Sequence, residues 1–350
     1  MITYQDRIRG SLIGGATGDA LGYTIEFVNE NRIFGQFGEK GITGYAISQN
    51  GKQEALFSDD TQMTLFTANG VLCAENIEKS PHSIEKSYFD WLVTQYYSFE
   101  ESRHILKHHN TWLRDVPGLY SPRAPGNTCL AALRHRLNSP DNVVSFIADT
   151  INNSKGCGGV MRVAPVGLYY READGKAVAK AAAEAAAVTH SHPLGYLPAA
   201  IFAYILHDIV CAADTIRLKE SVLRACQAIQ EIFDCQPEIE QMNALMYQAI
   251  ELSENTDTDL ENIHRLGEGW VGDEALAIAV YCSLRHEHDF SSAIIAAVNH
   301  KGDSDSTGSI AGNIVGALVG YEAIDDKWKQ RLELRDIILK VSDELSGAAV

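Results

Sequence analysis

Two short acidic segments carry the residue types that bind hard divalent cations. Residues 58–61 read SDDT and residues 303–306 read DSDS, so each segment offers two carboxylates beside hydroxyl side chains, without histidine or cysteine. Mg²⁺ and Mn²⁺ prefer such all-oxygen ligands. If the two segments meet, their carboxylates repel one another unless a cation lies between them. Two ions about 3.5–4 Å apart that share carboxylates form a common hydrolytic centre.

Each segment also has a purely structural interpretation. Asp, Ser and Thr are preferred N-cap residues, and acidic side chains in the first turn interact favourably with the helix dipole. Taken alone, either segment is explained as a solvated loop that caps a helix. The metal hypothesis therefore rests on the presence of two such segments in one chain, each at a predicted helix start.

The segment GDALGYTIEF at 18–27 contains two more carboxylates. Glu26 follows a predicted glycine-rich helix and is a candidate third oxygen ligand. Asp19 lies within that helix. It is either an outer residue of the metal site or a capping or buried hydrogen-bonding residue.

Two glycine-containing loops are candidates for binding an anionic ligand. Residues 155–167, KGCGGVMRVAPVG, precede a predicted helix with Arg162 nearby, and residues 121–133 place Asn127 at another helix start. Backbone N–H groups in such positions can bind a pyrophosphate. An ordinary tight turn is the alternative for either loop.

A further polar segment, THSHP at 189–193, contains His190 and His192. A zinc site here is disfavoured, because no cysteine and no third histidine lies nearby in the sequence. A hydrogen-bonding or substrate-stacking imidazole is the favoured interpretation.

Helical periodicity dominates the elements that must position these residues. Residues 218–233 place apolar side chains at a three-four spacing, and residues 177–188 are rich in alanine. No βαβ alternation is present, and the best strand candidate is a small β-hairpin near 45–57, around the Asn-Gly turn at 50–51. We expect an all-α protein, a single orthogonal helical domain over residues 1–350 with a central metal cleft.

Two of the predicted helices carry glycine at every fourth position. Glycine within a helix costs about 1 kcal/mol relative to alanine, so this spacing needs a reason. A spacing of four aligns the glycines on one ridge, where a neighbouring backbone can approach closely. We therefore expect two closely packed central helices, of which the second follows the DSDS segment. The glycines are Gly10, Gly14, Gly18 and Gly22 in the first helix, and Gly308, Gly312, Gly316 and Gly320 in the second.

Charge and composition exclude several classes of partner. The 350 residues include 46 acidic and 29 basic ones, a net charge of −17, which disfavours a broad nucleic-acid surface and contact with an anionic membrane but leaves room for a local anion site. The seven cysteines lack metal-finger spacing, and the N-terminus lacks a secretory signal. The most apolar stretch, 199–213, contains His207 and Asp208 and is too short to span a bilayer. We expect a cytoplasmic protein.

Taken in order, these motifs resemble those of the ADP-ribosylglycohydrolase family, which includes dinitrogenase-reductase-activating glycohydrolase and the ADP-ribosylarginine hydrolases. The resemblance extends over nearly the whole chain, and the paired acidic motifs carry most of its specificity. The motifs are GxxxGDALGxxxEF (14–27), SDDTxM (58–63), RAPGNT (123–128), GCGGVMRxAPxG (156–167), THxHP (189–193), GWVGDEALAxAxY (269–281) and NHxGDSDSTGxxxGxxxG (299–316).

The resemblance implies a binuclear Mg²⁺ or Mn²⁺ centre that holds the ribose hydroxyls beside the scissile anomeric carbon. The implied metal ligands are Ser58, Asp59, Asp60, Asp303, Asp305 and Ser306. The implied substrate-binding residues are Asn127, Gly156, Cys157, Gly158, Gly159, Arg162 and His190. The family often has a serine in the glycine-rich loop, and the cysteine found here leaves the pyrophosphate contact to the backbone.

The chemistry of a ribosyl bond agrees with this ligand set. Cleavage passes through an oxocarbenium-like centre, and metal ions can fix the hydroxyls and lower the pKa of a bound water. We assign Asp305 as a bridging ligand and Asp60 or Glu26 as the proton acceptor. The resemblance implies that the substrate is an ADP-ribosylated protein, with arginine as one candidate acceptor, or a small molecule, and that ADP-ribose is the product.

Two other functions are compatible with parts of the pattern. One is an ADP-ribose-binding or crystallin-like relative without turnover, which is disfavoured because all six implied ligand positions are filled. The other is a two-metal hydrolase of phosphate esters, which is disfavoured because the acidic segments lack a histidine-rich cluster.

Overall fold

The computed structural model describes residues 2–47, 53–105, 110–139, 143–213 and 216–347. The α-helices are α1 (Tyr4–Gly22), α2 (Glu30–Phe37), α3 (Asp59–Leu72), α4 (Ser80–Tyr96), α5 (Phe99–Ile105), α6 (Asn127–Leu137), α7 (Ala164–Tyr169), α8 (Gly175–Ala187), α9 (Pro193–Cys211), α10 (Leu218–Ile232), α11 (Glu238–Ser253), α12 (Asp259–Leu266), α13 (Gly272–Arg285), α14 (Phe290–Val298), α15 (Ser304–Val319), α16 (Asp326–Lys329) and α17 (Arg335–Ser346). The 3₁₀-helices are η1 (Trp112–Asp115), η2 (Pro117–Leu119), η3 (Cys157–Gly159) and η4 (Tyr321–Ala323).

The all-α class predicted from the sequence is confirmed, and the β-hairpin near 45–57 is wrong. Its flanks, as far as the structure describes them, contain no strand. Ala55 instead forms an isolated parallel bridge with Leu332, close to the C-terminus. The predicted turn at 50–51 lies outside the described residues. Ala55 and Phe57 are buried, and Ala55 pairs with a segment distant in sequence and not with the other predicted arm of the hairpin.

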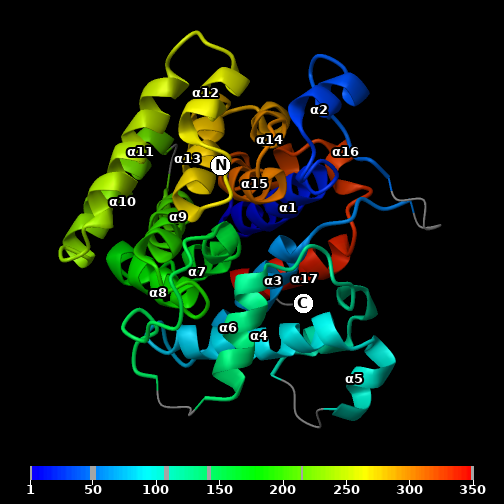
Figure 1. Ribbon diagram of the computed structural model, residues 1–350, viewed down its shortest axis with the longest axis vertical. Coiled ribbons are helices and arrows are strands. Elements are labelled where there is room, and N and C mark those ends of the chain that lie inside the picture. The colour runs from blue at the N-terminus through cyan, green and yellow to red at the C-terminus, as the bar shows by residue number, and fades with distance from the viewer. Residues whose placement is uncertain (1, 48–52, 106–109, 140–142, 214–215, 348–350) are drawn as a thin grey trace.

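The two glycine-rich helices, α1 and α15, pack directly against each other at the centre of the molecule (Figure 1). A Cβ atom on Gly14 would overlap the carbonyl oxygen of Gly312, and one on Gly18 would overlap that of Gly308. The backbones are therefore too close to admit any side chain along this ridge. The prediction of two closely packed central helices is confirmed.

The order of these contacts shows that α1 and α15 run antiparallel. Gly10 faces Gly316, near the end of α15, whereas Gly22 faces Ser304 at its beginning. The C-terminal end of α1 thus lies beside the N-terminal end of α15. This arrangement places the segment after α1, which contains Glu26, next to the DSDS segment.

A buried carboxylate holds the start of α3 on α1. Asp19 is fully buried and accepts hydrogen bonds from the backbone N–H of Ser58 (2.8 Å), from the backbone N–H of Thr61 (3.0 Å) and from the Thr61 hydroxyl (2.5 Å). Both oxygens of Asp19 are therefore committed to protein donors. Of the two roles that the sequence leaves open, the structure favours the buried hydrogen-bonding one.

Helix α9 is the most apolar of the long helices. It begins at Pro193, earlier than the apolar stretch suggests, so its 19 residues reach the length and hydropathy of a membrane span. However, 83% of its most apolar window is buried inside the protein, where α9 packs against α8, α10 and α13. Its apolar character is thus explained by its place in the core.

We predict that Gly14→Ala strongly destabilises the protein, because the new methyl group would meet the backbone of α15 rather than a side chain that can move. The expected loss in the free energy of unfolding is about 3 kcal/mol or more. Gly35→Ala in α2 is the matched control, since no heavy atom lies within 4 Å of the position that its methyl group would take. It should leave stability unchanged or raise it by up to about 1 kcal/mol. Equal denaturant midpoints for the two variants would contradict the close contact.

Candidate functional site

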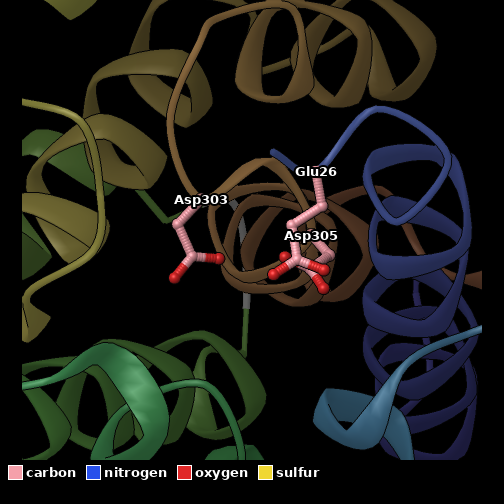
Figure 2. Close-up of side chains that lie close together, drawn as sticks. All are labelled: Glu26, Asp303 and Asp305. Carbon is pink, nitrogen blue, oxygen red and sulfur yellow. The ribbon is translucent and has the colours of Figure 1, made fainter. Parts of the chain in front are cut away.

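Three carboxylates from different parts of the chain meet at the junction of α1 and α15. Asp303 and Asp305 project from the N-terminal end of α15, and Glu26 projects from the turn that follows α1 (Figure 2). One oxygen from each lies within 4.8 Å of the others. The acidic cluster predicted from the sequence is therefore assembled in part by these three residues.

The SDDT segment supplies the neighbouring carboxylates at the start of α3. The charges of Asp59 and Asp60 both interact with that of Asp305, and Asp59 also interacts with Glu26. The backbone N–H of Gly126, just before α6, donates to Asp59 Oδ2 at 3.3 Å. Two helix starts, those of α3 and α15, thus direct their acidic residues at one another.

The capping interpretation is correct for both segments, but the solvated loop is not. Ser58 accepts a hydrogen bond from the N–H of Asp60 (3.2 Å), and Asp303 accepts one from the N–H of Ser306 (3.3 Å). Yet the four aspartates are almost completely enclosed, with exposed fractions of 3–4%. An N-cap alone needs no buried carboxylates, so burial separates this cluster from an ordinary pair of caps. The aspartates are Asp59, Asp60, Asp303 and Asp305.

Burial and mutual repulsion disfavour the ionised forms of these groups. Burial, followed by the charge of Asp305, raises the pKa values of Asp59, Asp60 and Asp303 well above the ordinary value. The same two causes, with further contributions from Asp303 and Asp59, raise the pKa of Glu26 to about 10. Without a cation, the cluster therefore retains protons that free carboxyl groups would lose near neutral pH.

The donor set fits a divalent cation. Asp60 Oδ2 and Glu26 Oε2 are buried and have no hydrogen-bond partner within the described part of the chain. A buried carboxylate oxygen without a partner is costly, and a cation would satisfy both its charge and its lone pairs. Oxygen ligands on two helix starts match the preference of Mg²⁺ and Mn²⁺. The residues present are thus suited to hold such ions.

The remaining predicted ligands lie beside the cluster. Ser58 is the N-cap of α3 and is fully buried. Ser306 is 2% exposed, its N–H donates to Asp305 Oδ1 at 3.0 Å, and its hydroxyl lies 3.8 Å from the sulfur of Met161. Both hydroxyls therefore belong to the same enclosed region as the carboxylates.

Cys157 joins the glycine-rich loop to the acidic cluster, which the sequence did not indicate. Its thiol donates a hydrogen bond to Asp303 Oδ2 at 2.7 Å, and its backbone N–H donates to the carbonyl of Trp270 at 3.3 Å. The sequence gives no sign of this contact, because the motif that contains Cys157 indicates only a glycine-rich loop for the substrate. The thiol is placed to orient one carboxylate of the cluster.

The glycines of this loop have packing reasons as well. A Cβ on Gly159 would overlap the carbonyl oxygen of Gly195, and one on Gly158 would lie 3.0 Å from both Cys129 Sγ and the His190 ring. At Gly156, the nearest atom would be His190 Nε2 at 3.3 Å. The loop is thus packed tightly against α9 and the histidine segment.

Arg162 supports this loop from behind. Its side chain is fully buried, donates to the Gly158 carbonyl and to the Thr189 hydroxyl (2.6 Å), and lies 4.7 Å over the ring of Tyr88. The sequence pattern predicts this guanidinium beside a ligand. The structure places it where it fixes the backbone of the loop.

His190 and Asn127 occupy different environments. His190 is 2% exposed, and its Nδ1 lies 2.8 Å from the Thr189 hydroxyl. Burial, with the nearby Arg162 charge, lowers the pKa of His190 to about 3, so the ring is neutral at physiological pH. Asn127 is exposed at the first turn of α6, one residue after the N–H that contacts Asp59.

These features define an all-helical protein whose central helix starts carry a buried, oxygen-only cluster suited to divalent cations. The family model of ADP-ribosylglycohydrolase matches residues 1–350, so the chain belongs to the ADP-ribosylglycohydrolase family. It is accordingly an enzyme that hydrolyses a glycosidic bond to ADP-ribose. The family is generally metal-dependent, in agreement with the chemistry of the cluster.

Two relatives and one solved structure are similar to this chain over nearly its whole length. ADP-ribosyl-[dinitrogen reductase] glycohydrolase of Rhodospirillum rubrum is 23% identical over 95% of this chain and 92% of its own length. ADP-ribosylarginine hydrolase Tri1 of Serratia proteamaculans is 24% identical over 97% and 79%, respectively. A solved structure titled "ADP-ribosylglycohydrolase-related protein complex" matches 99% of each chain with a TM-score of 0.65 and 22% identity, which supports the fold.

We predict that the metal-free protein becomes less stable as the pH rises from about 5 to about 8. The pKa of Glu26 rises on folding from 4.5 to about 10, and that of Asp19 from 3.8 to about 7. Because the folded state keeps protons that the unfolded state has lost, the stability present below about pH 4 declines through this range. Excess Mg²⁺ should reduce the slope, since the cation replaces the protons. Melting temperatures in EDTA and in Mg²⁺ measure both effects.

Asp305→Asn tests the origin of this slope with almost no change in shape. Removing the charge that raises its neighbours' pKa values should raise the melting temperature in EDTA at pH 8, by about 1.5 °C for each kcal/mol of repulsion relieved, and weaken the response to Mg²⁺. Asp336→Asn, at a side chain that is 93% exposed, is the control and should change neither. An Mg²⁺ response in Asp305→Asn equal to that of wild type would exclude this aspartate as a ligand.

Proposed function

We propose that this chain is a binuclear-metal-dependent hydrolase that removes ADP-ribose from a modified side chain, with arginine as the first candidate acceptor. The observation that carries the proposal is the buried convergence of Glu26, Asp303 and Asp305 with the two aspartates of α3. The names of the Rhodospirillum and Serratia relatives support an ADP-ribosylated protein as substrate and arginine as acceptor.

In this proposal, the ligands of two Mg²⁺ or Mn²⁺ ions are drawn from six residues at the two helix starts. When bound, the ions supply positive charge that fixes the ribose hydroxyls and acidifies a water molecule. The carboxylate cluster holds them, with Asp305 central because its charge interacts with each of the other acids. The ligands are Ser58, Asp59, Asp60, Asp303, Asp305 and Ser306.

Two residues are candidates for taking the proton of the attacking water. Glu26 Oε2 and Asp60 Oδ2 are both buried and free of hydrogen bonds within the described chain, so either has a lone pair available. A carboxylate that is poised by burial can accept the proton and later return it to the leaving group. Glu26 is the more exposed of the two. It reaches the cluster from the turn after α1, whereas Asp303 and Asp305 belong to the start of α15.

The ADP portion is assigned to the glycine-rich loop, with His190 and Asn127 beside it. The Gly156–Gly159 backbone lies next to the cluster through the Cys157–Asp303 hydrogen bond, so a ribose at the metals would have its phosphates within reach of the loop. Because His190 is neutral, it can donate or accept a hydrogen bond without adding a charge to the site. Arg162 contributes by holding the Gly158 carbonyl.

We predict that the protein, supplied with Mg²⁺, releases free ADP-ribose from an ADP-ribosylated arginine peptide. Activity should fall to background after chelation by EDTA and return with Mg²⁺ or Mn²⁺. Serine- and aspartate-linked peptides in the same assay identify the acceptor. ADP-ribose should inhibit competitively and AMP much less, because AMP lacks the distal ribose.

The nature of the product separates this function from the alternatives. Release of inorganic phosphate would indicate a phosphate-ester hydrolase, and tight binding of ADP-ribose without turnover would indicate a binding protein. Full activity after rigorous chelation would overturn the metal-dependent mechanism.

A further inference from the structure

A stacked aromatic pair is formed by two residues that adjoin the acidic cluster in sequence, Phe27 after Glu26 and Trp270 after Gly269. The rings of Phe27 and Trp270 are 5.3 Å apart between centroids and inclined by 19°. Phe27 directly follows Glu26 in the turn after α1, so one ring of the pair is next in sequence to a carboxylate of the cluster. The pair therefore joins the turn after α1 to the loop before α13.

The backbone at Trp270 is fixed by contacts with α15 and with the glycine-rich loop. The adjacent Gly269 packs against α15, where an added Cβ would lie 2.9 Å from Thr307 and 3.4 Å from the Cβ of Asp303. The Trp270 carbonyl accepts the N–H of Cys157, whose thiol donates to Asp303. The backbone that carries the ring of Trp270 is thus held by contacts that lead directly to a predicted metal ligand.

Phe27 combines two unfavourable features. The residue is 72% exposed although one face of its ring is covered in the stack, so the other face is open to solvent. Its φ of 63° lies in the left-handed region, which a bulky side chain rarely adopts and glycine adopts freely. A phenylalanine at this position therefore adds strain without hiding its apolar surface. Strain and exposure together at the edge of a catalytic cluster indicate a role in binding.

The charge around this ring selects the kind of group that would bind it. The chain as a whole carries a net charge of −17, so the field at the protein surface outside the metal-holding cluster favours cations. A planar cation is attracted both by such a field and by the face of an aromatic ring. A neutral, non-planar hydroxyl group gains little from either interaction.

We propose that Phe27, supported by Trp270, forms the acceptor subsite and selects a guanidinium-bearing substrate. This inference rests on the proposed function, because it assigns the part of the substrate that leaves when ADP-ribose is released. The open face of Phe27 receives the planar group of a modified arginine, and Trp270 holds that face in the required orientation. The two residues therefore determine acceptor preference and do not contact the ADP portion.

The test compares Phe27→Ala, Phe27→Tyr and wild type on ADP-ribosylated arginine and serine peptides. Phe27→Ala should raise KM for the arginine peptide about tenfold, in line with the loss of a cation–π contact, and change the serine peptide by less than about twofold. Phe27→Tyr should have the wild-type KM for the arginine peptide, because tyrosine keeps an aromatic face. ADP-ribose affinity, measured by calorimetry, should be the same in all three proteins.

Controls separate recognition from structural effects. Tyr247→Ala removes another half-exposed ring, on α11, and should leave both peptides unaffected. Trp270→Ala should weaken the arginine peptide selectively, as Phe27→Ala does.

Three results would overturn the inference. One is an equal loss of kcat on both peptides in Phe27→Ala, which would mean that the ring only positions Glu26. Another is an unchanged KM for the arginine peptide. The third is a wild-type enzyme that cleaves the serine peptide and not the arginine peptide. If wild type releases ADP-ribose from none of the arginine-, serine- and aspartate-linked peptides, the proposed function is overturned, and this inference with it.

Discussion

The backbones of α1 and α15 touch along a ridge of glycines, and the position of the acidic cluster depends on that contact. Gly14 and Gly18 leave no room for a side chain against Gly312 and Gly308. Because the helices are antiparallel, this register sets the end of α1 beside the start of α15. Glu26 then lies next to Asp303 and Asp305 although the two segments are at opposite ends of the chain. Each glycine weakens its own helix, and the close approach offsets this cost through packing.

The cluster in turn explains why capping residues are buried. Ser58 and Asp303 cap their helices in the ordinary way, which favours acidic and hydroxyl residues at both starts. Enclosing the carboxylates adds repulsion that capping does not require, as the raised pKa of Glu26 shows. Asp19 is the exception, because all its oxygens accept hydrogen bonds from α3 and keep that helix in place. A divalent cation resolves the conflict for the acids that lack such donors.

The sequence is most informative where the physical signal is local. Glycines four apart in a helix predict a close helix contact, because their cost in helix stability has to be offset by packing. Two short acidic segments at helix starts likewise predict a shared cluster. The predicted hairpin is wrong because Ala55 pairs with Leu332, a partner that no local sequence pattern indicates. The Cys157–Asp303 hydrogen bond and the Phe27–Trp270 stack were missed for the same reason. Arg162 shows a further limit of prediction from sequence. In the sequence, a buried arginine that supports a loop cannot be told from an arginine that binds an anion.

Electron paramagnetic resonance of Mn²⁺ added to the metal-free protein tests the central claim most directly. If the carboxylates of α3, α15 and Glu26 share two ions about 3.5–4 Å apart, the bound ions interact magnetically. We expect about two tightly bound Mn²⁺ per chain and a spectrum of coupled ions. Tight binding with the spectrum of isolated ions would contradict the binuclear centre, and the absence of tight binding would contradict the metal site itself.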